Sequence, residues 1–195
     1  MADAVYQEEE YYTYADILKL DESVRAEIID GELFMMAPPV TGHQIISREL
    51  LGQLWQFLKG KPCQVFAAPF GVRLFPRADL SDDTFLEPDL AVICDRSKIT
   101  KEGCEGAPDM VIEILSPSNT RHDRLRKFRK YLAAGVKEYW IVDGGEKTVD
   151  VHILDNGRYV TSVSGGDDEV PVSVLPGCTI TLRDVWPGQI PENGE

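Results

Sequence analysis

The stretch DMVIEILSPSNTRHDRLRKFRKYLAAGVKEYWIVD, residues 109–143, decides the fold. Its apolar run Met110–Leu115 predicts a buried strand, and the turn residues at 116–119 end that strand. A basic helix is predicted over about 123–134, and the run Tyr139–Val142 predicts a second strand. A strand, a helix and a strand in this order are typical of a β-α-β unit.

Glu113 is the only charge in the first of these apolar runs. Burying a carboxylate without a partner is costly, so we expect a cation beside it. Upstream, Pro88-Asp89 opens another apolar strand. The helix that follows Glu113 carries the bases Arg124, Arg126, Lys127, Arg129 and Lys130. We interpret Asp89, Glu113 and Lys127 as parts of one metal-dependent nuclease site.

Phosphodiester hydrolysis explains why these residue types belong together. The reaction needs a poised water, an electrophile that binds the phosphate, and neutralisation of charge in the transition state. A divalent metal held by two or three carboxylates supplies much of this, because it activates a bound water and polarises the phosphoryl oxygen. Carboxylate oxygens suit Mg²⁺ or Mn²⁺. Asp89 and Glu113 are therefore the expected metal ligands, and Lys127 is expected to orient the water or stabilise charge.

The helix after Glu113 must let its lysine reach that carboxylate. Its expected core-facing stripe consists of Leu125, Phe128 and Leu132. Lys127 lies at the edge of this stripe, one turn before Tyr131, and its side chain can extend back to the strand end. Asp123 lies four residues before Lys127, where it either orients the ammonium or caps the helix.

Length and charge limit the possible organisation. At 195 residues with 43% apolar content, the chain predicts a single domain over 1–195, with flexible tails at 1–12 and 187–195. The net charge of −13 argues against a broad nucleic-acid-binding surface. However, residues 121–130 hold six bases and one acid. This segment is either a localised anion site or a solvated helix face.

The four cysteines are widely spaced and include no C-x-x-C pair. We interpret Cys63, Cys94, Cys104 and Cys178 as small buried hydrophobes in a reducing compartment, not as a zinc site or a disulfide framework. The acidic N-terminus lacks the pattern of a signal peptide, and no apolar run approaches the roughly 20 residues of a membrane helix. We expect a soluble, cytoplasmic protein that does not contact membranes.

The remaining elements complete an α+β fold. Asp30-Gly31 and Asn156-Gly157 predict two-residue hairpin turns. Thr13 and Asp16 resemble a capping box that opens a helix to about Leu20. A longer helix is predicted over 43–59, with an apolar stripe of Ile46, Leu50, Leu51, Leu54, Trp55, Phe57 and Leu58. Further strands are expected near 64–68, 71–75, 89–94, 170–174 and 179–182, and a polar, mobile loop over 76–86. The sum is a mixed central sheet flanked by two helices, an α/β/α arrangement.

Several of these motifs together resemble one protein family. They are EIIDGEL, the His43 helix, EPDLAVI, VIEILSPSN and the run D-x-x-x-K-x-x-x-Y-x-x-x-G-V-x-E-Y-W-I-V-D. They resemble the Uma family of restriction-endonuclease-like proteins, within the PD-(D/E)xK nuclease superfamily, over about residues 13–182. The resemblance implies a restriction-endonuclease-like core, Mg²⁺ dependence and catalytic Asp89, Glu113 and Lys127. It also implies that Glu27 and His43 lie at the margin of the site.

The chain departs from the superfamily pattern at one position. There the pattern has a lysine two residues after the acid, and this chain has Leu115. The resemblance implies that the lysine has migrated to the helix as Lys127, and Lys130 is the other lysine within reach. A migrated lysine is physically sensible, because only the position of the ammonium matters.

Several candidate residues also have a plain structural interpretation. Asp89 could cap a strand after the proline, and Glu27 could be a surface strand residue or a partner of Arg25. His43, at a helix start, could form local hydrogen bonds only. Ser116 could contact phosphate, but Ser-Pro-Ser is first of all a turn.

The expected function is a Mg²⁺-dependent (or Mn²⁺-dependent) endonuclease that hydrolyses phosphodiester bonds, with DNA as the expected partner. One alternative is a catalytically inactive nuclease-fold domain that binds nucleic acid or a protein partner. Another is a metal hydrolase acting on small phosphoesters. A homodimer could address both DNA strands, and the C-terminal hairpins could supply its edge.

Overall fold

The computed structural model describes residues 10–21, 23–116 and 121–188, with side chains from residue 124 onward in the last range. Its largest element is a six-stranded sheet, the central sheet, with strand order β11-β10-β9-β8-β6-β3. These strands are β3 (Gln64–Ala67), β6 (Leu90–Ile93), β8 (Met110–Ile114), β9 (Glu138–Asp143), β10 (Thr148–Asp155) and β11 (Arg158–Gly165). Strands β8 and β9 are parallel, and the other neighbours are antiparallel.

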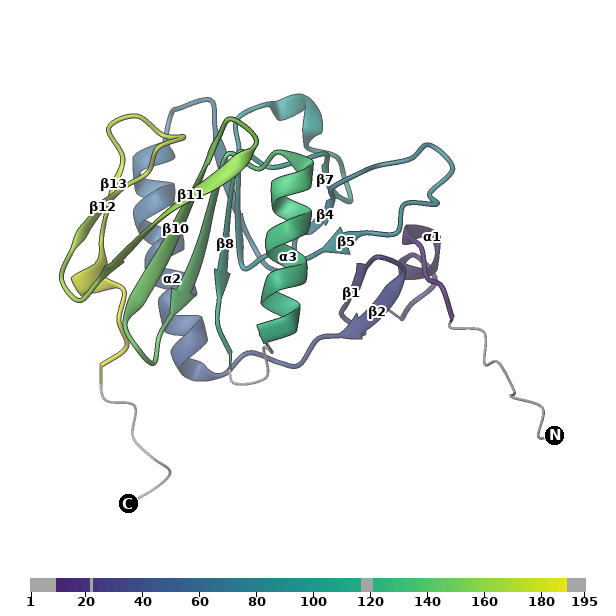
Figure 1. Cartoon of the computed structure of the whole chain (residues 1–195), viewed down its shortest axis with the longest axis horizontal. Coiled ribbons are helices and arrows are strands. Elements are labelled where there is room, and N and C mark those ends of the chain that lie inside the picture. The colour runs from purple at the N-terminus through teal and green to yellow at the C-terminus, as the bar shows by residue number, and fades with distance from the viewer. Residues whose placement is uncertain (1–9, 22, 117–120, 189–195) are drawn as a thin grey trace, which may run out of the picture.

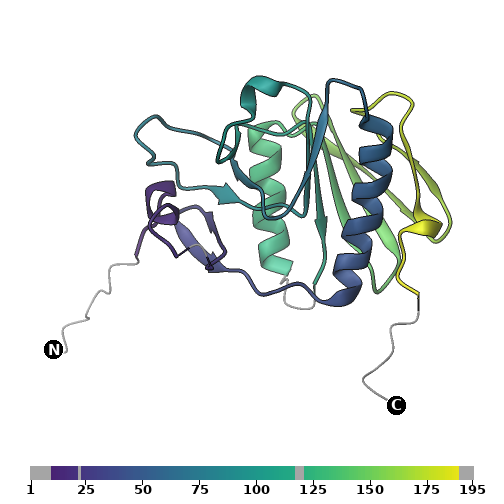
Figure 2. The ribbon, with the colours of Figure 1, turned by 180° about the vertical axis from the view of Figure 1, so that it is seen from behind.

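Two long helices cover the central sheet. Helix α2 (Thr41–Leu58) and helix α3 (Arg121–Ala134) lie on opposite faces of it, as the two views in Figures 1 and 2 show. Helix α3 connects the parallel strands β8 and β9, which confirms the predicted β-α-β unit. The mixed sheet between two helices confirms the predicted α/β/α arrangement of the α+β class.

A five-stranded side sheet lies next to α3, with strand order β2-β1-β5-β4-β7. Its strands are β1 (Ala26–Ile29), β2 (Glu32–Met35), β4 (Gly71–Arg73), β5 (Phe85–Leu86) and β7 (Gly103–Glu105). The short helix α1 (Tyr14–Ile17) precedes this sheet, and a 3-10 turn, η1 (Arg96–Lys98), precedes β7. The chain ends in a two-stranded unit, β12 (Glu169–Pro171) and β13 (Thr179–Thr181), followed by η2 (Leu182–Asp184). The predicted strands near 64–68 and 71–75 thus belong to different sheets.

Local sequence signals explain several of these elements. Asp30 and Gly31 have φ of 55° and 79°, the left-handed values that a type I′ turn requires, so β1 and β2 form the predicted hairpin. Asn156 and Gly157, at 48° and 79°, do the same for β10 and β11. The capping box of Thr13 and Asp16 is also present, although α1 ends earlier than predicted.

The apolar side chains form one core on each face of the central sheet. On one face, α2 contributes Ile46, Leu50, Leu54 and Leu58, all of them buried. On the other, α3 contributes Tyr131, which packs with Tyr139 of β9. Trp55 is 58% exposed, so its predicted place in the stripe of α2 is wrong.

The predicted polar loop over 76–86 contains ordered structure. The carboxylate of Asp82 is buried and accepts two hydrogen bonds from the guanidinium of Arg73, at 2.9 and 2.6 Å. Phe85 and Leu86, at the end of the same stretch, form β5. At the predicted N-terminal tail, the backbone N–H of Tyr12 donates to the carbonyl of Gly31 at 2.8 Å. Long-range hydrogen bonds therefore fix segments whose local composition suggested a loop and a tail.

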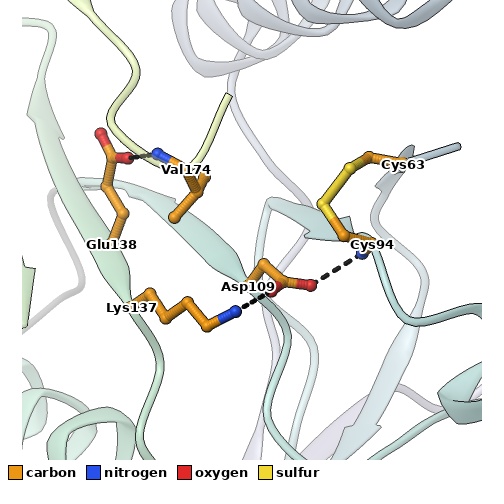
Figure 3. The surroundings of a disulfide bond; sticks show 6 residues. All are labelled: Cys63, Cys94, Asp109, Lys137, Glu138 and Val174. Atoms are coloured by element: carbon orange, nitrogen blue, oxygen red, sulfur yellow. Dashed lines mark hydrogen bonds and ion pairs between the residues drawn. A yellow bond between two sulfur atoms is a disulfide. The ribbon is translucent and has the colours of Figure 1, made fainter. Parts of the chain in front are cut away.

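Cys63 and Cys94 form a disulfide bond, so the prediction that no cysteine is disulfide-bonded is wrong. The register of β3 against β6 pairs Gln64 with Ile93, and the two cysteines lie opposite each other one position further along. Figure 3 shows the bond beside Asp109, whose carboxylate accepts a hydrogen bond from the backbone N–H of Cys94 at 2.7 Å. Only strand pairing brings these two thiols together, since 31 positions separate them in sequence.

Reduction of this disulfide is expected to lower the free energy of unfolding by roughly 2–4 kcal/mol, because the bond restricts the unfolded chain. Urea denaturation with and without dithiothreitol measures the effect. A Cys63→Ser, Cys94→Ser double variant is the control and should not respond to the reductant. Cys104 and Cys178 are free and buried, so alkylation of the unfolded, unreduced protein should modify these two thiols alone. Modification of all four would contradict the assignment.

None of the helices in the described part of the chain has the length and apolarity needed to cross a bilayer.

Candidate functional site

Asp89 and Glu113 lie together at one end of the central sheet. Leu90 of β6 pairs with Ile112 of β8, so Asp89 and Glu113 are opposite each other one position further along. The backbone N–H of Ile114 donates to Oδ2 of Asp89 at 2.7 Å, which holds this carboxylate against the end of β8. The antiparallel pairing of β6 with β8 therefore brings together two acids that are far apart in sequence.

Lys127 reaches this strand end from α3. Its Nζ lies 3.1 Å from both carboxylate oxygens of Glu113 and 2.9 Å from Oε1 of Glu27. The side chains of all three residues are only 7–13% exposed. Lys130, the other candidate, binds Asp30 instead. The lysine that the structure brings to Glu113 is thus Lys127.

The inward face of α3 differs from the predicted stripe. Leu125 is 46% exposed, so its assignment to the core is wrong. Tyr131 is fully buried, and its hydroxyl donates to Oε1 of Glu113 at 2.6 Å. Lys127 and Tyr131 are four residues apart, so they project from the same side of the helix. The rotation of α3 places Lys127 over the strand end, where it contacts Glu113.

Glu27 belongs to the same cluster, through β1 of the side sheet. Its Oε1 accepts two hydrogen bonds of 2.9 Å, one from the ammonium of Lys127 and one from the backbone N–H of Glu87. Arg25 pairs with the side chain of Glu87, at 2.7 Å. Glu27 is also buried, so both alternative interpretations, a surface strand residue and a partner of Arg25, are wrong.

His43 lies in the first turn of α2 and contacts the other acid. Its Nε2 lies 3.1 Å from Oδ1 of Asp89, and its Nδ1 is buried without a hydrogen-bond partner among the described residues. Burial acts to lower the pKa of His43, but the hydrogen bond to Asp89 and the charges of Asp89 and Glu113 outweigh it and raise this pKa. Asp89 is thus held between the backbone of β8 and the imidazole of α2.

The cluster contains more negative than positive charge. Burial, together with the nearby charges of Glu27 and Asp89, raises the pKa of Glu113 to about 7 although Lys127 acts to lower it. Burial acts to lower the pKa of Lys127, but the two glutamates outweigh it and raise that pKa, so the ammonium keeps its proton. Burial also raises the pKa of Tyr131 well above its usual range, so its hydroxyl remains a donor. Lys127 pairs with two glutamates, and Asp89 adds a third carboxylate whose charge acts on Glu113, so a further cation would be electrostatically favoured there.

Part of the basic surface of α3 is occupied by the β1–β2 hairpin. Arg126 pairs with Glu32 at 2.5 Å, and Lys130 pairs with Asp30. Arg129 is exposed and forms no ion pair with any described residue. The bases of this helix are therefore neither uniformly solvated nor uniformly free for an anion.

Two features of this cluster and its surroundings were absent from the sequence-based prediction. Tyr131 was used only as a marker of helix spacing, although its position four residues after Lys127 indicates that both reach the same acid. The acidic hairpin that binds α3 has no local signal, because its partners lie about a hundred positions away. The predicted turn beyond Ser116 and the side chain of Asp123 lie outside the described residues.

Comparison with known proteins identifies the family. The Uma2 family, described as "Putative restriction endonuclease", matches residues 8–183. The chain belongs to the Uma2 family. A solved structure titled as a putative nuclease belonging to DUF820, from Anabaena variabilis ATCC 29413, matches 90% of this Uma2 chain and 97% of its own. Its TM-score is 0.72 and its sequence identity is 25%. An uncharacterised protein of Synechocystis sp. (strain ATCC 27184 / PCC 6803 / Kazusa), slr1290, is 26% identical over 136 residues, 69% of each chain.

These similarities confirm the resemblance drawn from the motifs. The match to the Uma2 family spans the cluster from Glu27 to Tyr131, and the similar solved structure shares its nuclease-like fold. The family and the fold together support a nuclease-like function for this Uma2 protein.

Proposed function

We propose that the chain is a metal-dependent endonuclease that hydrolyses phosphodiester bonds in DNA. The observation that carries the proposal is the Lys127 ammonium, 3.1 Å from both oxygens of Glu113. In the superfamily pattern a lysine would stand at position 115, where this chain has Leu115. A lysine from the following helix can serve in its place, because charge stabilisation depends on where the ammonium lies and not on which element carries it.

Asp89 and Glu113 would hold the metal. Within the described ranges, no group of three or more His, Cys, Asp or Glu side chains is arranged to hold a metal ion. Mg²⁺ needs fewer, since it usually keeps several waters and binds proteins through one or two carboxylates. The donors fit, because carboxylate oxygens are hard ligands and the charges of Glu27 and Asp89 beside Glu113 would favour a cation. A bound Mg²⁺ or Mn²⁺ would lower the pKa of a water and polarise the phosphoryl oxygen.

The surrounding residues have separate tasks in this proposal. Lys127 keeps its proton and stabilises negative charge that develops on the phosphate or on the attacking water. Glu27 holds the ammonium of Lys127 beside Glu113, through the 2.9 Å contact. His43 fixes the carboxylate of Asp89 from the side of α2.

The charge distribution supports a local contact with the DNA backbone. Arg129, the exposed base among the described side chains of α3, would neutralise a phosphate next to the site. The net charge of −13 would repel DNA elsewhere, so binding should be weak and salt-dependent. We also propose a homodimer that addresses both strands, with the edge strand β11 as its contact; size-exclusion chromatography with light scattering tests this.

One alternative is a nuclease-fold domain that binds nucleic acid or a protein without cutting. The acidic surface favours this alternative. The cluster argues against it, because a domain without catalysis has no need to bury two glutamates around one lysine.

Cleavage and metal binding test the proposal together. Supercoiled plasmid and an unstructured RNA are incubated with the protein and Mg²⁺ or Mn²⁺, beside a nitrophenyl phosphate. We expect the plasmid to be cut, chelation by EDTA to stop the reaction, and calorimetry to detect Mn²⁺ binding. Binding of DNA without metal binding or cleavage would favour the non-catalytic domain. Hydrolysis of the small ester alone would indicate a small-phosphoester hydrolase.

A further inference from the structure

The hydroxyl of Tyr131 donates a short hydrogen bond to the carboxylate of Glu113. It donates to Oε1 at 2.6 Å, a shorter contact than either distance from Lys127 to the same carboxylate. A hydrogen bond to a carboxylate is shorter and stronger than one between neutral groups. Tyr131 comes from the turn of α3 that follows Lys127, so two donors on one rigid helix converge on one acid.

The aromatic ring of Tyr131 cannot move easily. The residue is fully buried, and its ring lies 4.9 Å from the ring of Tyr139, with an interplanar angle of 51°. Its backbone carbonyl accepts a 3.0 Å hydrogen bond from the N–H of Val136, a residue that lies just beyond the end of α3. The hydroxyl is therefore positioned by the core between α3 and the central sheet, and it orients Glu113 rather than following it.

The contact with Tyr131 determines which acceptor site of Glu113 stays available. An ionised carboxylate offers about four lone-pair sites, two on each oxygen. Among the contacts described for this part of the chain, Oε1 accepts hydrogen bonds from Tyr131 and Lys127, and Oε2 accepts one from Lys127. The remaining site lies on Oε2. A glutamate has several rotatable bonds, and these two donors select the orientation that leaves Oε2 available.

We propose that Tyr131 is a positioning residue, whose hydroxyl holds Oε1 of Glu113 so that Oε2 is presented to the divalent cation. This inference rests on the proposed metal-dependent function. Tyr131 would not touch the substrate or the cation. Residues that hydrogen-bond a metal-ligating carboxylate in this way commonly change metal affinity by 10–100-fold when replaced.

Tyr131→Phe tests the inference, because it removes the hydroxyl and keeps the buried ring. The matched control is Tyr159→Phe. The hydroxyl of Tyr159 donates to the backbone carbonyl of Val136 at 2.9 Å, so this variant also loses one hydrogen bond but leaves Glu113 untouched. Both variants should lose similar thermal stability, about 2–4 °C in Tm.

Calorimetric titration of the full-length chain with Mn²⁺ separates the two variants. We expect Tyr131→Phe to weaken Mn²⁺ binding about 10–100-fold and Tyr159→Phe to leave it within about twofold of the wild type. Equal affinities of Tyr131→Phe and the wild type would overturn this inference and leave the proposed function in place. A wild-type protein that does not bind Mn²⁺ would overturn both. A crystal structure of Tyr131→Phe should show a changed orientation of Glu113, and an unchanged orientation would also overturn the inference.

Discussion

Asp89→Asn is expected to reduce the rate of plasmid cleavage by about 10³-fold. The substitution keeps the size of the side chain but removes a charge that holds the cation. Charge stabilisation by a metal lowers the activation free energy by several kcal/mol, and each 1.36 kcal/mol changes the rate about tenfold. The asparagine oxygen can still accept the N–H of Ile114, which now lies 2.7 Å from Oδ2, so the fold should be retained. Single-turnover cleavage with Mg²⁺ measures the effect.

Asp109→Asn is the matched control for this prediction. Asp109 also accepts a backbone N–H across the β6–β8 pair, from Cys94 at 2.7 Å, and it also has a side-chain partner, Lys137. It lies at the opposite end of these strands from Asp89. We expect Asp109→Asn to cleave at close to the wild-type rate. Similar losses in both variants would mean that Asp89 acts through stability, and an active Asp89→Asn would contradict its assignment as a ligand.

Lys127→Met is expected to lower the free energy of unfolding by about 3–5 kcal/mol at pH 8, the usual cost of leaving a buried charge without its partner. Methionine retains most of the side-chain length but removes the ammonium between Glu27 and Glu113, which are both nearly buried. Arg129→Met, on the exposed face of the same helix, should change the free energy of unfolding by less than about 0.5 kcal/mol. Urea denaturation of both variants measures the difference.

The pH dependence of this loss identifies its cause. The pKa of Glu113 is raised by burial from 4.5 to about 7 in the folded protein, and removal of Lys127 should raise it further. A raised acid pKa favours the folded state at low pH, and that advantage disappears as pH rises through the folded pKa. Lys127→Met should therefore approach Arg129→Met in stability at pH 5 and diverge from it above pH 7. A loss that does not vary with pH would point to packing instead of charge.

The elements of the β-α-β unit were predictable because their signals are local. The apolar run before Leu115, the basic helix and the run after Tyr139 each contain their own periodicity. The two hairpins follow from dipeptides that tolerate left-handed conformations, such as Asp30-Gly31. A carboxylate inside a buried apolar run is costly without a partner, so Glu113 could be identified as a candidate without a structure.

The sequence by itself thus determined the β-α-β unit, the long helices and the two hairpin turns, and which acids and which two lysines, Lys127 and Lys130, to consider. Only the tertiary structure decided the rotation of α3, which buries Tyr131 and exposes Leu125, and the pairing of Cys63 with Cys94. The contact of Lys127 with Glu27 likewise joins segments a hundred positions apart. The physical reason is the range of the interactions: turn and helix preferences act between neighbours, whereas burial and charge pairing depend on which distant surfaces meet.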